Sequence, residues 1–217
     1  MSGVHGGMLC IFTRAPVLGG VKRRLARDLG DTAALRAHEC LVADTLARLG
    51  GVPGFAVELW IAGTCNDSVR QWSRRWALPV RLQRGDDLGE RMADALLGGL
   101  ERCPLAFVVG TDCPDVDAGY VRAAARALTH ADVVIGPAED GGFGLIGARR
   151  AAAGRLPALF REVPWGSATV LATTLRRAQA AGVSVARLRE IWDVDTAEDW
   201  ARFLAARRDA GQDPGAV

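Results

Sequence analysis

The stretch Leu105-Ala-Phe-Val-Val-Gly-Thr-Asp-Cys-Pro114 joins an apolar run to an abrupt polar end. The unbroken apolar run at residues 105–109 predicts a strand that is buried on both faces, as in the middle of a parallel sheet. Asp112 follows that strand so closely that its carboxylate needs a partner, because an unpaired charge beside a core costs free energy. The stretch therefore predicts a parallel sheet with a polar site at the carboxyl ends of its strands.

Strands and helices alternate on both sides of this stretch. Strands are expected at residues 8–13, 55–62, 80–83, 132–135, 143–148 and 183–188, and helices at 31–49, 66–76, 87–101, 117–128, 157–160, 167–181 and 196–206. This alternation predicts an α/β fold, a three-layer sandwich in which helices cover both faces of a mostly parallel sheet. A single domain is expected over residues 8–207, followed by a disordered tail at 208–217.

Composition disfavours several classes of protein. The net charge of +2 over 217 residues is too small to favour nucleic acid or a membrane surface as a partner. The five cysteines include no Cys-x-x-Cys pair, which favours reduced thiols in a cytoplasmic protein over disulfides or a cysteine zinc site. No apolar stretch approaches the ~20 residues of a membrane span, and no signal peptide is expected at the start.

The loop after the first expected strand, residues 14–25, is rich in glycine and in basic side chains. Backbone N–H groups at glycines and the charges of lysine and arginine together favour phosphate binding. The alternative is a solvated basic turn, because the spacing matches neither a P-loop nor a dinucleotide-binding fingerprint. The candidate phosphate-binding residues are Arg14, Ala15, Pro16, Gly19, Lys22 and Arg24.

A second candidate loop runs from Gln83 to Arg91 and is expected at the same edge, where ligands bind in parallel sheets. A capping box at the start of a helix accounts for its residues 87 and 90. It does not account for Gln83, Arg84 and Gly85, which are expected to contact a base or a phosphate of the donor.

Asp112 is the leading candidate for a metal-binding residue. Carboxylate oxygens suit Mg²⁺ or Mn²⁺, which also bridge diphosphates. A second carboxylate opposite Asp112 would complete a metal clamp, and the segment Trp192-Asp-Val-Asp-Thr196 offers Asp193 and Asp195. Only one of these two is expected to face the site. Asp195 is expected to face the metal because it lies nearest the strand end, with Asp193 holding the turn.

The acceptor side of a site is expected near residues 136–147. Glycines there allow a ligand to approach the backbone, although Asp-Gly is also the usual signal of a hairpin turn, and both interpretations can hold together. Trp165 is either a buried aromatic or a platform for the acceptor, and Ser167 is the expected cap of the helix that follows. The candidate acceptor-side residues are Glu139, Asp140, Gly141, Gly142 and Trp165.

Five blocks together resemble one bacterial family. They are the segment 12–25 with its Thr-Arg-Ala-Pro and Val-Lys elements, Gln83-Arg-Gly-Asp-Asp-Leu-Gly-Glu-Arg-Met92, Gly110-Thr-Asp-Cys-Pro114, Pro137-Ala-Glu-Asp-Gly-Gly-Phe143 and the segment 193–199. The chain is similar to the GT-A-type transferases usually labelled glycosyltransferases, and more distantly to molybdenum cofactor guanylyltransferase and phospholactate guanylyltransferase. It departs from the family pattern at Arg23, at Phe143-Gly144 and at Ser167, and these departures bear on acceptor specificity.

The resemblance implies the nucleotide-diphospho-sugar transferase (GT-A) fold. It also implies that Asp112 binds metal, that Asp193 and Asp195 form a distal acidic block, and that the loop carrying Arg14, Lys22 and Arg24 faces phosphate. Asp112 and Lys22 are then the expected catalytic residues, with Mg²⁺ or Mn²⁺ as cofactor.

Glycosyl transfer from a nucleotide sugar to a small-molecule acceptor is the first functional hypothesis. The basic loop also favours an alternative, nucleotidyl transfer from an NTP to a phosphorylated small molecule, because a departing pyrophosphate brings extra charge to that loop. A nucleotide-binding module without catalysis is a third possibility, which the intact acidic residues disfavour.

Overall fold

A single mixed sheet organises residues 6–211, the part of the chain that this computed structural model describes. Its strand order is β3-β2-β1-β4-β6-β5-β7, and only β6 runs antiparallel to its neighbours. The strands are β1 Gly7–Arg14, β2 Phe55–Ala62, β3 Val80–Leu82, β4 Leu105–Gly110, β5 Val133–Pro137, β6 Phe143–Arg149 and β7 Val185–Arg187. The expected α/β fold with a mostly parallel sheet is therefore confirmed.

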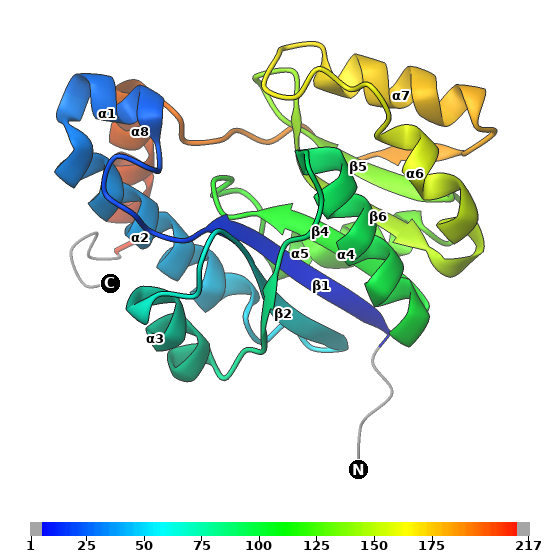
Figure 1. Cartoon of the computed structure of the whole chain (residues 1–217), viewed down its shortest axis with the longest axis horizontal. Coiled ribbons are helices and arrows are strands. Elements are labelled where there is room, and N and C mark those ends of the chain that lie inside the picture. Colours follow the sequence, from blue (N-terminus) through cyan, green and yellow to red (C-terminus); the bar gives the residue numbers. More distant parts are fainter. Residues whose placement is uncertain (1–5, 212–217) are drawn as a thin grey trace.

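Helices cover both faces of the sheet (Figure 1). They are α1 Arg23–Leu29, α2 Asp31–Leu49, α3 Asp67–Trp76, α4 Leu88–Arg102, α5 Ala118–Ala127, the 3₁₀ helix η1 Arg150–Arg155, α6 Leu156–Leu159, α7 Val170–Ala180 and α8 Ala197–Asp209. On β1, Leu9 and Ile11 pack with α2, α3 and α5, while Met8 and Cys10 pack with α4, α6 and α7. Alternate residues of a strand point to opposite faces, so this one apolar strand supports two cores.

Several elements differ from the sequence prediction. Helix α1 begins inside the loop expected at residues 14–25, and the 3₁₀ helix η1 was not expected. Helix α7 begins at Val170 rather than at residue 167, and its N-cap makes no side-chain hydrogen bond. Helix α8 continues to Asp209, beyond the expected boundary at 207, and residues 212–217 of the expected tail lie outside the described residues. None of the described helices combines the length and apolar character that crossing a bilayer requires.

Every strand except β6 ends at the same edge of the sheet, because these strands are mutually parallel. After β7 the chain returns across this edge before α8 begins, as the connection from β7 to α8 shows in Figure 1. The return segment is fixed by backbone hydrogen bonds from Ile191 to the Pro137 carbonyl and from Val194 to the Asp112 carbonyl, both 2.9 Å. A capping box of Thr196 and Asp199 then starts α8, as the sequence predicted.

Asp132 joins the three strands at the other end of this half of the sheet. It accepts hydrogen bonds from the Arg149 guanidinium (Nη2–Oδ1, 2.6 Å) and from the Ser184 N–H (3.2 Å), and it pairs with Arg155. These partners hold the pKa of Asp132 well below its usual range, at about 2, with the Arg149 hydrogen bonds as the largest cause.

We expect Asp132→Asn to lower the free energy of unfolding by about 1–3 kcal/mol at pH 7. The carboxylate has a lower pKa in the folded protein than in the unfolded chain, where it is about 3.9. The difference in the free energy of unfolding between wild type and variant is therefore fully present above about pH 4, and it is lost as the pH falls toward about 2. Urea unfolding across this range measures it. The exposed Asp94→Asn on α4 is the control, and an equal loss in that variant would contradict the account.

Candidate functional site

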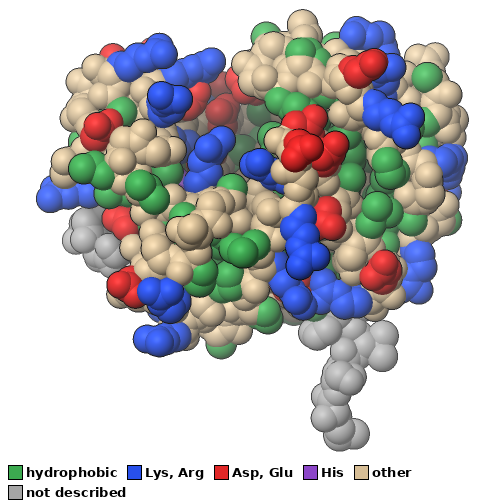
Figure 2. All heavy atoms as spheres, viewed as in Figure 1, with side chains coloured by type: hydrophobic (Ala, Val, Ile, Leu, Met, Phe, Trp, Pro, Cys, Tyr) green, Lys and Arg blue, Asp and Glu red, His purple; other side chains and the backbone are tan. Residues whose placement is uncertain are grey.

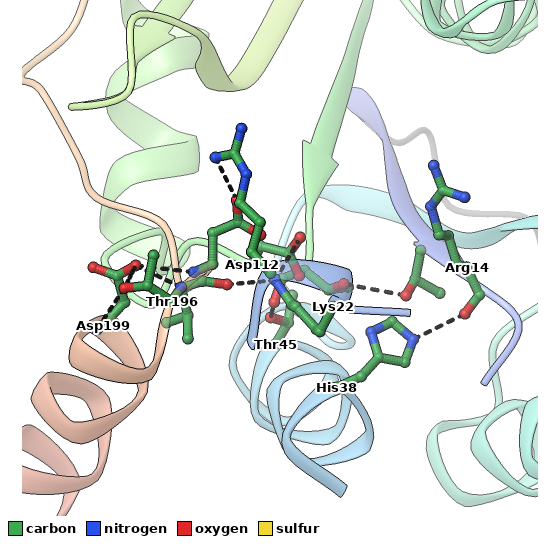
Figure 3. Close-up of polar contacts among 12 residues, drawn as sticks. Arg14, Lys22, His38, Thr45, Asp112, Thr196 and Asp199 are labelled. Atoms are coloured by element: carbon green, nitrogen blue, oxygen red, sulfur yellow. Dashed lines mark hydrogen bonds and ion pairs between the residues drawn. The ribbon is translucent and has the colours of Figure 1, made fainter. Parts of the chain in front are cut away.

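Lys22 forms the centre of the site at the carboxyl edge. Its Nζ lies 2.9 Å from Asp112 Oδ2 and also donates a hydrogen bond to the Val194 carbonyl. The Lys22 side chain is only 6% exposed, whereas that of Asp112 is 47% exposed, so the carboxylate faces solvent and the ammonium lies beneath. Figure 3 shows Lys22 beside Asp112, with the start of α8 on one side and Arg14 and His38 on the other.

Lys22 is the only lysine among the 27 lysine and arginine residues of the chain. An ammonium is a compact charge with three donors, whereas a guanidinium is a broad planar fork. The buried position between Asp112 and the Val194 carbonyl suits the compact group. The backbone of Lys22 is left-handed (φ 46°), which costs free energy for a residue with a side chain, and its carbonyl accepts the first hydrogen bond of α1 from Ala26.

Helix α1 is the element at the site that sequence reasoning missed. Leu25 is fully buried against Ala34 and Ala37 of α2, and Gly30, with a positive φ, ends the helix. Leu25 followed by Gly30 was the available signal, but the short helix lacks a capping side chain. It turns the expected phosphate loop into a shorter turn at residues 15–22 with a helix behind it.

Asp193 and Asp195 occupy the reverse of their expected places. Asp193 lines a cavity together with Asp112, whereas Asp195 lies outside that lining and pairs with Arg24 at 2.9 Å. The Val194 N–H binds the Asp112 carbonyl at 2.9 Å, which brings Asp193 beside Asp112, and the Asp195 N–H binds Asp199 Oδ2 at 3.1 Å, which holds Asp195 at the start of α8. The expectation that Asp195 faces Asp112 and that Asp193 holds the turn is therefore wrong.

The charge around Asp193 is not fully compensated. Burial, as the largest cause, and the neighbouring carboxylates of Asp140 and Asp112 together raise the pKa of Asp193 to about 6, against the opposing charge of Lys22. A carboxylate in this position would gain from a bound cation.

A cavity of about 270 Å³ opens beside these carboxylates. Its lining residues are Leu88, Met92, Gly110, Asp112, Cys113, Ala138, Asp140, Gly142, Phe143, Gly144, Trp165, Gly166, Ser167, Val170 and Asp193. Gly144 is required there because a Cβ atom would lie 2.3 Å from the Cys113 sulfur. Figure 2 shows this face of the molecule hollowed between the side of α1 and α8 and the side of α7, with acidic and basic side chains along the hollow.

The candidate acceptor-side residues divide into two groups. Asp140, Gly142 and Trp165 line the cavity, and the Trp165 indole N–H is buried without a hydrogen-bond partner among the described residues. Glu139 points away and pairs with Arg202 of α8 at 3.2 Å. Gly141, with a positive φ of 84°, closes the hairpin turn between β5 and β6, and its carbonyl accepts from the N–H of residue 171.

The candidate phosphate loop is tied to the sheet through its main chain. The Arg14 carbonyl accepts a hydrogen bond from the His38 ring, and the Ala15 N–H donates to the Ala62 carbonyl at 2.9 Å. The Pro16 carbonyl accepts a hydrogen bond from the side-chain amide of Asn66. Gly19 has a positive φ of 72°. The loop is thus held open at the edge, with the Arg14 and Arg24 side chains exposed and Lys22 beneath.

The second candidate loop is fixed mainly by one amide. The Gln83 nitrogen donates to the Thr13 carbonyl (3.2 Å) and the Trp60 carbonyl (3.0 Å), so it bridges the ends of β1 and β2. Gly85 takes a backbone conformation (φ 133°) that favours glycine, and its carbonyl accepts from Arg91. Arg84 is exposed and makes no ion pair or hydrogen bond with the described residues.

A buried polar group behind the site was not foreseen from the sequence. His38 of α2 lies 4% exposed, and burial lowers its pKa, so the neutral ring donates from Nε2 to the Arg14 carbonyl at 3.0 Å. Thr111 donates to Thr13 Oγ1 at 3.1 Å and joins the ends of β4 and β1. The buried face of the helix at residues 31–49 was the signal that could have placed His38.

Asp193→Asn tests the charge at this site. The raised pKa of Asp193 means that the metal-free folded protein loses stability as the pH rises from about 4 to about 6. We therefore expect the variant to melt at a higher temperature than wild type at pH 8, with no difference near pH 4. Asp195→Asn, which loses only an exposed ion pair, should change stability by about 0–1 kcal/mol or less. Scanning calorimetry in chelator measures both, and a lower melting temperature for Asp193→Asn at pH 8 would contradict the assignment.

Solved structures confirm the fold. A candidate nucleotide-diphospho-sugar transferase from Desulfovibrio desulfuricans G20 is 28% identical, with a TM-score of 0.85 over 95% of this chain and 90% of that one. Rv0371c from Mycobacterium tuberculosis, solved in complex with manganese, is 16% identical, with a TM-score of 0.58 over 92% and 99% of the two chains. A nucleotidyl transferase from Methanothermobacter is 17% identical, with a TM-score of 0.60 over 94% and 99%.

The expected GT-A-type resemblance is confirmed by these similarities. The 28% identical protein also supports the expected class, an enzyme of the glycosyltransferase or nucleotidyltransferase type. A search of curated proteins gives no match. Residues 45–167, more than half of the chain, match the family described as "Uncharacterized protein conserved in bacteria" (DUF2064), and the chain belongs to that family.

Proposed function

We propose that the protein is a metal-dependent transferase that takes a nucleotide sugar as donor and passes its glycosyl group to a small acceptor. The observation that carries the proposal is the cluster of Lys22, Asp112 and Asp193 at the carboxyl edge of the sheet. In parallel sheets this edge is where ligands bind. The 28% identical candidate nucleotide-diphospho-sugar transferase supports the same class of donor.

The carboxylates fit a divalent cation that is shared with the donor. No group of three or more His, Cys, Asp or Glu side chains in residues 6–211 is placed to hold a metal alone. Mg²⁺ typically binds in such sites through one or two carboxylates and the phosphates of the substrate, and Asp112 and Asp193 supply the two carboxylates. After burial, the carboxylates of Asp140 and Asp112 contribute to the raised pKa of Asp193, so a cation bound beside these carboxylates would be favoured. The manganese bound by the M. tuberculosis protein is consistent with this choice of ion.

The residues of the chain then have distinct roles. Lys22 contributes positive charge beneath Asp112, where it can bind a phosphate oxygen of the donor. The exposed Arg14 and Arg24 side chains flank the same turn and favour an anionic ligand. A bound divalent ion would neutralise the charge that develops on the departing nucleoside diphosphate. The acceptor enters from the cavity that Asp140 and Trp165 line, on the other side of Asp112.

Nucleotidyl transfer remains the second candidate function, favoured by the three basic residues of the turn and by similarity to a nucleotidyl transferase of the same fold. The products separate the two reactions. Glycosyl transfer releases a nucleoside diphosphate from a nucleotide sugar, whereas nucleotidyl transfer releases pyrophosphate from a nucleoside triphosphate.

We expect release of nucleoside diphosphate from a nucleotide sugar in the presence of Mg²⁺ or Mn²⁺. Excess chelator, or Asp112→Asn, should lower the rate by about 10²-fold or more, since each removes charge stabilisation at the leaving group. Asp86→Asn, an exposed carboxylate at the same edge, is the control and should keep activity. Full turnover of the nucleotide sugar in excess chelator would contradict the proposal, and so would release of pyrophosphate from a nucleoside triphosphate in place of this reaction.

Lys22 gives a second test that does not depend on turnover. Lys22→Ala should weaken binding of a nucleoside diphosphate by roughly ten- to a hundredfold, the strength of a charge-assisted hydrogen bond, and leave binding of the bare nucleoside unchanged. Lys22→Arg should not restore affinity, because the buried position suits an ammonium. Calorimetric titration measures each affinity, and an equal loss for nucleoside and diphosphate would show that Lys22 does not bind phosphate.

A further inference from the structure

The cavity beside Asp112 limits the size of the acceptor. Its volume of about 270 Å³ lies at the small end of ligand pockets. A compact molecule, or one compact end of a longer molecule, therefore fits.

The walls of the cavity divide into an apolar and an acidic side. Leu88, Met92, Phe143, Trp165 and Val170 supply the apolar side, and Phe143 meets the Trp165 ring edge-on at 6.4 Å between centroids. The acidic side carries three aspartates, and the lining includes no lysine, arginine or histidine. A ligand in this space thus meets apolar surface and negative charge, without a cation in the wall.

Four basic side chains of the segments around this edge are paired with carboxylates. These pairs are Lys22 with Asp112, Arg24 with Asp195, Arg189 with Asp115 and Arg202 with Glu139. A divalent ion would add two positive charges, but the diphosphate of the donor brings about two negative charges with it. The surplus negative charge on the acceptor side therefore remains when the donor is bound.

Asp140 supplies part of this charge from the turn between β5 and β6. One of its oxygens, Oδ1, accepts a hydrogen bond from the Gly142 N–H at 2.8 Å, which fixes the carboxylate at the turn between β5 and β6. The adjacent Glu139 has the same charge but lies outside the cavity lining, paired with Arg202. The two neighbours thus differ in whether they face the acceptor.

From this division of the walls we infer that the acceptor is a compact alcohol, uncharged or positively charged, that packs an apolar face on Phe143 and Trp165. The same walls reject acceptors that carry a phosphate or a carboxylate within the cavity. The inference rests on the proposed function, since it assigns this cavity to the acceptor. It also bears against the alternative reaction, because that reaction needs a phosphorylated acceptor.

Three alcohols on one aromatic frame test the inference by binding alone. They are 1,4-benzenedimethanol, 4-(aminomethyl)benzyl alcohol and 4-(hydroxymethyl)benzoate, which present a neutral, a positive and a negative group at the same position. Saturation-transfer NMR ranks the affinities of the three alcohols for the full chain. The samples contain a nucleoside diphosphate and Mg²⁺ in place of the paramagnetic Mn²⁺. We expect the neutral and cationic alcohols to bind at least tenfold more tightly than the carboxylate.

Matched variants identify the side chain that discriminates between the carboxylate and the other two alcohols. Asp140→Asn should raise the affinity for 4-(hydroxymethyl)benzoate several-fold, whereas Glu139→Gln should leave the ranking unchanged. Ser167→Phe, at an exposed position of the lining, should abolish binding of all three alcohols without unfolding the protein.

Several results would overturn the inference. The first is that 4-(hydroxymethyl)benzoate binds as tightly as the neutral alcohol, and the second is that Glu139→Gln alters the ranking as much as Asp140→Asn does. The third is that the alcohols still bind to Ser167→Phe, and the fourth is that none of the three alcohols binds to the wild type. If the ranking holds while no nucleotide sugar is turned over, the chemistry of the cavity stands and the proposed reaction fails, so the two failures are distinguishable.

Discussion

The buried ammonium of Lys22 is the group on which the geometry of the site depends. It joins three segments that are distant in sequence: the turn after β1, the end of β4 at Asp112, and the return segment at Val194. A charge that is 6% exposed is stable only while its partners stay in place, since removing one partner leaves an uncompensated charge. The pair therefore fixes the return segment against the sheet, and with it Asp193. It also places positive charge where the donor's phosphates are proposed to bind.

The site is also divided into a basic side and an acidic side. Basic side chains gather on the turn after β1 and on α1, whereas the hairpin after β5 and the return segment contribute carboxylates. Asp112 lies at the boundary, half exposed, between the Lys22 ammonium and the cavity. An anionic donor and a non-anionic acceptor would each meet a complementary surface across this boundary, and the reacting atoms would meet at Asp112.

Much of the fold could be predicted from the sequence because its strands are local and strongly apolar. The run before Asp112 and the capping box of Thr196 and Asp199 formed as expected. The order of Asp193 and Asp195 could not be predicted, because it depends on a tertiary contact, the hydrogen bond from Val194 to the Asp112 carbonyl. Helix α1 was missed because it is short, uncapped by a side chain and stabilised by packing on α2. Of the positions where the sequence departs from its family's pattern, Phe143, Gly144 and Ser167 line the cavity, a grouping visible only in three dimensions.

The central claim is that two carboxylates bind a divalent ion only together with the donor's phosphates. Electron paramagnetic resonance of free Mn²⁺ measures this directly, because bound and free ions differ in signal. The account predicts weak Mn²⁺ binding by the protein alone, and binding at least tenfold tighter when a nucleotide sugar is present, with the gain lost in Asp193→Asn. Equal Mn²⁺ affinity with and without the nucleotide sugar, or a gain that survives in Asp193→Asn, would contradict it.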